Sequence, residues 1–142
     1  MNDNSKINDI KGKELNFIQE RAYKEALEDI KRYVYPNRYK FDYIYGIPRG
    51  GLIPAVYLSH KLDIPMIMDL HEIESNKSLL ITEDIIDSGN TIKQFINNLP
   101  STIKRYEIVS IISKASSKNL ANYSSIVIKN DDWIVFPYEV KY

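Results

Sequence analysis

The chain has 142 residues, with 19 basic and 19 acidic side chains, so its formal net charge is zero. It contains no cysteine and only 5 glycines, where average usage would give about ten. This length fits one domain with a substantial core and is too short for two ordinary domains. The lack of cysteine excludes a disulfide framework, a thiolate metal site and a cysteine nucleophile. It is compatible with a reducing cytoplasm.

The balance of charge argues against a nucleic-acid partner, because a broad nucleic-acid-binding face usually appears as a basic excess. No apolar run approaches the roughly 18 to 20 residues of a membrane helix, and residues 1–6 lack the apolar stretch of a signal peptide. We therefore expect a cytoplasmic globular protein that binds neither nucleic acid nor a membrane.

The hydrophobic pattern predicts helices that alternate with strands. Residues 1–13 are polar and aperiodic, which predicts a flexible N-terminal arm before one domain at 14–142. Helical spacing predicts helices at 14–34, 52–62 and, after Gly89, up to Pro100. Strands are expected at 43–47, 66–68, 78–82, 107–113, 123–128 and 133–136, with a loop at 69–77. This alternation implies a single α/β domain, an open and mainly parallel sheet flanked by helices.

The turn around Gly89 has the composition of a phosphate site. It joins a hydrophobic strand to a helix start, where free backbone amides and the positive helix end favour an anion. The hydroxyls of Ser88 and Thr91 add donors that suit a phosphate group. Simple helix capping also favours Asp, Ser and Asn at such a turn, so this loop alone leaves both interpretations open.

Three carboxylates lie at the end of the same strand: Glu83, Asp84 and Asp87. They repel one another unless a cation or a hydroxyl-rich ligand accompanies them, and this edge of a doubly wound sheet is where ligands bind. Mg²⁺ prefers oxygen ligands shared with substrate phosphates. We therefore expect a sugar diol and a magnesium ion here, the alternative being a solvated acidic turn.

A second strand-to-helix loop contains Gly46 and Gly51 at the spacing of a P-loop. Leu52 and Ile53 stand where that motif needs Lys and Ser or Thr, which argues against nucleoside triphosphate binding of that type. Arg49 beside two glycines is a candidate clamp for a second phosphate group. An arginine in a turn is also commonly solvated.

Residues 79–91, LLITEDIIDSGNT, closely resemble the phosphoribosyl-pyrophosphate-binding signature of the type I phosphoribosyltransferases. Pro48-Arg49-Gly50-Gly51 is similar to the pyrophosphate loop of that family. Lys114 after its strand, and the segment 133–139, look like the 6-oxopurine branch. The resemblance extends over about residues 15–139 and implies the fold of that family, with a minimal hood formed by the chain ends.

The resemblance implies how the phosphoribosyl donor is bound. Its 5′-phosphate would lie against the loop that consists of Asp87, Ser88, Gly89, Asn90 and Thr91. Glu83 and Asp84 would hold the ribose hydroxyls, directly or through Mg²⁺. Arg49 and the Gly50 amide would bind pyrophosphate, in a loop that often carries a cis non-proline peptide, here near Pro48-Arg49.

The resemblance also implies a purine site. Asp87 would accept the proton at N7 of the base, and Lys114 would donate to its 6-oxo group, since an ammonium has only donors. Trp133 would stack on the ring and Ile134 would contact its edge through the backbone, while Glu139 would bind a second Mg²⁺ through waters. Three of these residues have an ordinary alternative interpretation. Trp133 could be a core residue, Lys114 could be solvated, and Glu139, near the chain end, could simply be exposed.

The implied activity is the Mg²⁺-dependent transfer of the phosphoribosyl group to hypoxanthine, guanine or xanthine in purine salvage, by a dimer or tetramer. Alternatives are transfer to another nucleobase and a non-catalytic regulator that binds phosphoribosyl pyrophosphate. The 69–77 loop is shorter than the closing loop of related enzymes and lacks their Ser-Tyr pair. Either this loop, with Lys77, or a neighbouring subunit covers the reaction, or turnover is slow.

Overall fold

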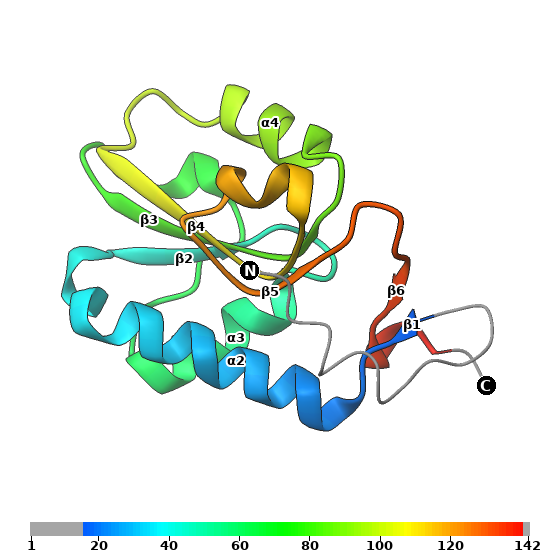
Figure 1. Cartoon of the computed structure of the whole chain (residues 1–142). Coiled ribbons are helices and arrows are strands. Elements are labelled where there is room, and N and C mark those ends of the chain that lie inside the picture. The colour runs from blue at the N-terminus through cyan, green and yellow to red at the C-terminus, as the bar shows by residue number, and fades with distance from the viewer. Residues whose placement is uncertain (1–15, 141–142) are drawn as a thin grey trace.

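A computed structural model describes residues 16–140. Its centre is a four-stranded parallel sheet of order β2-β3-β4-β5, flanked by helices on both faces (Figure 1). The main elements are β2 (Tyr43–Gly46), β3 (Ser78–Ile86), β4 (Arg105–Lys114), β5 (Tyr123–Ile128), α2 (Glu20–Val34), α3 (Leu52–Leu62) and α4 (Asn90–Asn97). The expected α/β fold with an open parallel sheet is confirmed.

The sheet separates two apolar clusters. Successive residues of a strand point to opposite faces, so Leu80 packs in the cluster that contains α2 and α3, while Leu79 and Ile81 pack in the cluster beneath α4. Strands buried on both faces appear in the sequence as continuous apolar runs. This is why β3 and β4 were recognisable without the structure.

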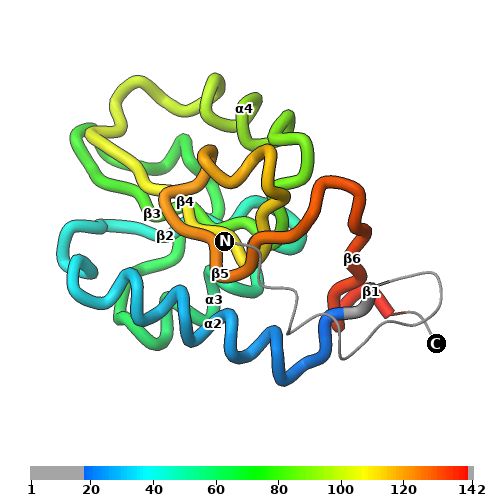
Figure 2. Tube along the Cα trace, in the orientation of Figure 1, coloured from blue at the N-terminus to red at the C-terminus, as the bar shows by residue number. Residues whose placement is uncertain are grey.

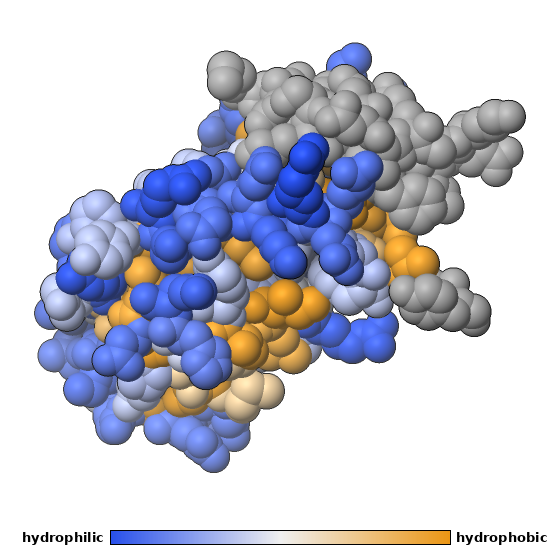
Figure 3. All heavy atoms as spheres, turned by 90° about the horizontal axis from the view of Figure 1, so that it is seen from below, coloured by the Kyte–Doolittle hydropathy of each residue, from blue (hydrophilic) through white to orange (hydrophobic). Residues whose placement is uncertain are grey.

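Figure 3, which views the molecule from below, shows polar side chains around an apolar area near the middle of this face. On α3, Ile53 and Val56 are exposed large apolar residues. No helix within residues 16–140 is both long and apolar enough to cross a membrane.

The register of the sheet brings three loops to one edge. Gly46 lies opposite Thr82, and Ile86 lies opposite Ser113. Because these strands are parallel, the segments that follow β2, β3 and β4 leave the sheet at its carboxyl edge, where α/β folds bind ligands.

A second, two-stranded parallel pairing joins the ends of the described chain. β1 (Asn16–Phe17) pairs with β6 (Ile134–Val135), and the pair lies beside the main sheet (Figure 2). The short 3₁₀ helix η4 (Pro137–Glu139) follows β6. This pair and η4 form the small hood that was expected from the chain ends.

Two predicted elements were wrong in detail. The helix expected at 14–34 begins only at Glu20, because residues 16–17 are in β1 and the Ile18 amide donates to the Val135 carbonyl at 3.1 Å. The strand expected at 66–68 is reduced to a single bridge between Met66 and Ile44.

The remaining differences concern element ends. The strands expected at 78–82 and 107–113 are longer, and the one expected at 133–136 is shorter and lies outside the main sheet. The 52–62 helix and the 123–128 strand have their predicted bounds. The predicted arm at 1–13 lies outside the described residues.

The 69–77 segment is held against the body of the protein. It contains the short 3₁₀ helix η2 (Leu70–Glu72). Leu70 and Ile73 pack against the cluster beneath α4. The Tyr43 hydroxyl donates to Glu74 Oε2 at 2.8 Å, and the Asn76 amide donates to the Thr102 carbonyl at 2.8 Å.

Candidate active site

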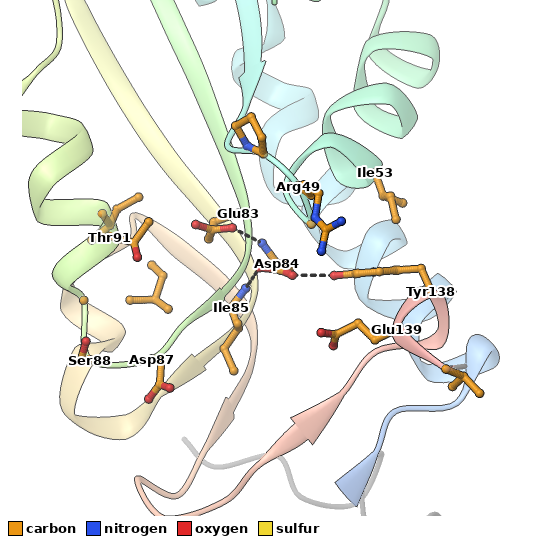
Figure 4. A pocket seen from close by; sticks show the side chains of 16 residues that line it. Arg49, Ile53, Glu83, Asp84, Ile85, Asp87, Ser88, Thr91, Tyr138 and Glu139 are labelled. Carbon is orange, nitrogen blue, oxygen red and sulfur yellow. Dashed lines mark hydrogen bonds between the residues drawn. The ribbon is translucent and has the colours of Figure 1, made fainter. Parts of the chain in front are cut away.

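A cavity of about 790 Å³ opens at the carboxyl edge of the sheet. Three segments line it: the loop before α3, the end of β3 with the turn that follows, and η4. Most of the predicted site residues are on its wall, namely Arg49, Gly50, Glu83, Asp84, Asp87, Ser88, Gly89, Thr91 and Glu139. In Figure 4, Asp87, Ser88 and Thr91 lie on one side of the cavity, and Arg49, Tyr138 and Glu139 on the other.

The loop before α3 is pressed against β3. The Ile47 amide donates to the Thr82 carbonyl at 3.0 Å, and Thr82 Oγ1 donates to the Gly51 carbonyl at 2.7 Å. A Cβ at Gly51 would lie 2.4 Å from the Thr82 carbonyl oxygen, so only glycine fits at this approach. The peptide between Pro48 and Arg49 is cis, as the resemblance implied.

The turn between β3 and α4 is tight and leads directly into the start of a helix. Gly89 has φ of +88°, a left-handed conformation that glycine adopts readily. The Asn90 amide donates to Ser88 Oγ at 3.3 Å, and α4 begins at Asn90. The Ser117 hydroxyl, from the 3₁₀ helix η3 (Ala115–Leu120), donates to the Asp87 carbonyl at 2.6 Å and anchors the turn. The free amides at the start of α4 therefore border the cavity.

Two adjacent carboxyls at the end of β3 have different surroundings. Glu83 is 7% exposed and its Oε1 accepts from the Asp84 amide at 3.0 Å. Burial, reinforced by the neighbouring Asp84, raises the pKa of Glu83 to about 9. Asp84 is half-buried, with Oδ1 accepting from the Ile85 amide at 2.7 Å and Oδ2 from the Tyr138 hydroxyl at 2.6 Å.

Asp87, in the turn after β3, forms an ion pair with Lys114, the last residue of β4. The distance from Lys114 Nζ to Asp87 Oδ1 is 2.7 Å, and the lysine side chain is 12% exposed while that of the aspartate is 53% exposed. The residues at the ends of β3 and β4, predicted separately from the sequence, are thus in direct contact.

Glu139 lies in a turn that its own side chain stabilises. Its Oε1 accepts from the Phe136 amide at 2.9 Å, and its own amide donates to the Phe136 carbonyl at 3.0 Å. Glu139 therefore reaches the cavity wall from η4, opposite the turn after β3.

The carboxylates do not form a complete metal cage. Among residues 16–140, no three His, Cys, Asp or Glu side chains are grouped as metal ligands. One or two carboxylates at a cavity edge are what Mg²⁺ uses when substrate phosphates complete its coordination. The residues present therefore fit a cation that is bound together with a substrate phosphate.

Several curated proteins with similar sequences carry the same name. A xanthine-guanine phosphoribosyltransferase of Idiomarina loihiensis is 24% identical over 141 residues, covering 85% of this chain and 84% of the relative. One of Nitratidesulfovibrio vulgaris is 27% identical over 119 residues, covering 70% of this chain and 71% of the relative. No protein-family model matches the chain.

Solved structures extend the comparison to the fold. A purine phosphoribosyltransferase from Pyrococcus horikoshii superposes with a TM-score of 0.75 at 27% identity, covering 89% of this chain and 94% of that one. In both sequence and fold, the chain is thus similar to purine phosphoribosyltransferases. A Helicobacter pylori xanthine-guanine-hypoxanthine phosphoribosyltransferase has the same fold, with a TM-score of 0.72 at 19% identity and coverage of 87% and 92%.

Four predicted site residues do not line the cavity: Asn90, Lys114, Trp133 and Ile134. Asn90 is the first residue of α4, between the cavity-lining residues Gly89 and Thr91. Lys114 forms an ion pair with Asp87, which does line the cavity. Ile134 is buried in β6. Trp133 is 62% exposed, so it is not the core tryptophan that the ordinary alternative proposed. Their roles toward a base stay predictions.

Sequence reasoning assigned no role to Tyr138, although it precedes Glu139. The only signal available was its position beside a candidate metal ligand. Its contact with Asp84 spans 54 positions in the chain, and no local pattern encodes such a contact. Ser117, which anchors the turn after β3, was missed for the same reason.

Proposed function

We propose that this phosphoribosyltransferase is Mg²⁺-dependent and transfers the phosphoribosyl group of phosphoribosyl pyrophosphate to a 6-oxopurine, giving the nucleoside monophosphate and pyrophosphate in cytoplasmic purine salvage. The observation that carries the proposal is the convergence of two strand-to-helix loops and the carboxyls of β3 on one cavity. The names of the similar proteins, which include xanthine, guanine and hypoxanthine, support a 6-oxopurine as the acceptor.

The two sides of the cavity suit the two ends of the donor. The turn at Ser88, Gly89 and Thr91 offers amides and hydroxyls for the 5′-phosphate, at the positive end of α4. Arg49, exposed on the opposite side, suits the pyrophosphate. Asp84 lies between them (Figure 4), where its carboxylate would accept hydrogen bonds from the ribose hydroxyls.

The carboxyl chemistry fits a magnesium ion that arrives with the substrate. Asp84, Glu83 and Glu139 are the residues that would hold it, and it would neutralise charge on the departing pyrophosphate. A raised pKa keeps Glu83 protonated at neutral pH, so the edge carries less negative charge until a cation or diol is bound.

The Asp87–Lys114 pair is suited to recognise one edge of a 6-oxopurine. The 6-oxo group and N7 are neighbours on that edge, so one donor and one acceptor side by side match them. Lys114 has two further hydrogens after its bond to Asp87 Oδ1, and these can reach the oxo group. The free oxygen of Asp87 can take the base proton as the C1′–pyrophosphate bond breaks and the bond from C1′ to the base forms.

Closure of the site would involve another molecule of the protein. The 69–77 segment is held down at Leu70, Ile73 and Glu74, so it does not supply a free lid. A dimer or tetramer in which a neighbouring subunit covers the cavity is therefore part of the proposal. Size-exclusion chromatography with light scattering measures this state.

The test is a panel of nucleobases incubated with the pure protein, Mg²⁺ and phosphoribosyl pyrophosphate, following pyrophosphate release. Release with hypoxanthine, guanine or xanthine supports the proposal, and release only with another base indicates a different acceptor. Binding of phosphoribosyl pyrophosphate with no release for any base indicates a regulator. Asp87→Asn is expected to keep donor binding and to lose about 100-fold or more in turnover. Equal rates for both proteins would exclude the proton-acceptor role.

A further inference from the structure

The hydroxyl of Tyr138 reaches across the cavity wall to a carboxylate of the sheet. It donates to Asp84 Oδ2 at 2.6 Å, from η4 to the end of β3 (Figure 4). The other oxygen of Asp84 accepts from the Ile85 amide at 2.7 Å. These two donors, one on each oxygen, fix the plane of the carboxylate, and the carboxyl of Glu83 lies within hydrogen-bond reach of it as well.

The ring of Tyr138 is held independently of its hydroxyl. It stacks on Phe136 with ring centroids 5.4 Å apart and an interplanar angle of 9°. It also meets Tyr23 edge-on at 6.1 Å. Phe136 and Tyr23 are 2% and 6% exposed, so both are anchored in the core. Removing the hydroxyl alone therefore leaves the ring with the same packing partners.

Gly50 makes room for this contact. A Cβ built on Gly50 would lie 1.8 Å from Asp84 Oδ2 and 2.7 Å from the Tyr138 hydroxyl. The hydrogen bond therefore runs directly over the backbone of the loop that carries Arg49. Three segments that are distant in sequence meet at this one carboxylate.

We infer that Tyr138 is a positioning residue, whose hydroxyl orients the Asp84 carboxylate toward the ribose hydroxyls of the phosphoribosyl donor. The inference rests on the proposed function. Without the hydroxyl, the carboxylate loses its bond from η4, keeps only partners on β3, and must be ordered further when the substrate binds. The cost falls on donor binding, whereas the base contacts other residues.

Tyr23 provides a matched control. Its hydroxyl is buried and has no hydrogen-bond partner among the described residues. Tyr23→Phe therefore makes the same chemical change in the same aromatic cluster, without removing a bond to Asp84. Loss of a bond to a charged group costs more than loss of an unpaired hydroxyl.

The experiment measures kcat and both KM values for wild type, Tyr138→Phe and Tyr23→Phe, together with their melting temperatures. Tyr138→Phe is expected to raise the KM for phosphoribosyl pyrophosphate about tenfold, with the KM for the base unchanged and the melting temperature close to that of wild type. Tyr23→Phe is expected to leave both KM values unchanged.

Titration of Mg²⁺ with phosphoribosyl pyrophosphate by calorimetry, without a base, is expected to show the same loss of affinity in Tyr138→Phe alone. An unchanged or lower donor KM in Tyr138→Phe, or an equal rise in Tyr23→Phe, overturns the positioning role while the proposed function stands. A wild-type protein that neither binds the donor nor releases pyrophosphate overturns both.

Discussion

The contact between Gly50 and Asp84 makes a quantitative prediction for Gly50→Ala. The new Cβ would lie 1.8 Å from Asp84 Oδ2 and 2.3 Å from its Cγ, where ordinary contact begins near 3.4 Å. The carboxylate must therefore move by more than 1 Å (roughly the overlap with ordinary contact), which breaks its bond to Tyr138. We expect the free energy of unfolding to fall by about 2 kcal/mol.

The cause of this loss can be isolated with a second substitution. Asp84→Ala removes both of the atoms nearest to the new Cβ, and the third-nearest atom is the hydroxyl oxygen of Tyr138, at 2.7 Å. Gly50→Ala made in the Asp84→Ala background is therefore expected to cost no more than about 0.5 kcal/mol. Part of that remainder is offset because alanine restricts the unfolded chain more than glycine does.

Urea unfolding of the four proteins, followed by circular dichroism, gives the cycle directly. A coupling energy of about 1.5 kcal/mol between the two sites is expected. If Gly50→Ala destabilises both backgrounds equally, the clash with Asp84 is not the cause, and the packing described for this corner of the cavity is wrong.

Three further predictions concern neighbouring residues. Burial raises the pKa of Glu83 to about 9, so the folded state keeps a proton that the unfolded chain releases above its ordinary value of 4.5. Stability is therefore present in full below that ordinary value and is lost as the pH rises toward 9. Glu83→Gln should remove this slope in thermal melts at pH 5, 7 and 9, and parallel slopes for both proteins would contradict it. Gly89→Ala introduces a side chain at φ of +88° and 2.3 Å from Leu120 Cδ1, so urea unfolding should show a loss of about 2 kcal/mol. Leu120→Ala should relieve only the steric part of that loss, and full relief would show that backbone strain contributes nothing. Lys114→Met removes the ion pair with Asp87. It should raise the KM for the base about tenfold or more, with little change in donor binding. An unchanged KM for the base would exclude a role for Lys114 at the 6-oxo group.

The central sheet could be predicted because its strands are buried on both faces. β3 and β4 each contain a run of Ile, Leu and Val, and all of these except Ile85 are buried. Such runs need no partner to be recognised. β1 and the Met66 bridge were missed because their pairing joins distant segments. Two-residue strands of this kind depend on tertiary contacts rather than on local pattern.

The acidic and glycine-containing parts of the site were predictable for a different reason. Residues at the carboxyl ends of parallel strands meet at one edge, so the loops after β2 and β3 converge whatever their side chains do. The contacts between side chains could not be predicted. The ion pair of Asp87 with Lys114 and the bond of Asp84 to Tyr138 depend on rotamers and on the position of η4.

The low glycine content has a structural counterpart. Gly46, Gly50, Gly51 and Gly89 all lie where a Cβ would meet another atom within 2.5 Å. All four are in or beside the two loops that border the cavity. The chain uses glycine where the backbone approaches another segment closely, which is what a wall built from loops requires.

The most direct test of phosphoribosyl transfer is the mass of the product. Pure protein is incubated with Mg²⁺, phosphoribosyl pyrophosphate and an equal mixture of xanthine, guanine, hypoxanthine and adenine, and the nucleoside monophosphates are identified by mass spectrometry. The expected result is monophosphate of one or more of the three 6-oxopurines and little or none of adenine, with all product lost in Asp87→Asn. Absence of every monophosphate from the wild-type reaction, or adenine as the preferred acceptor, would contradict 6-oxopurine transfer.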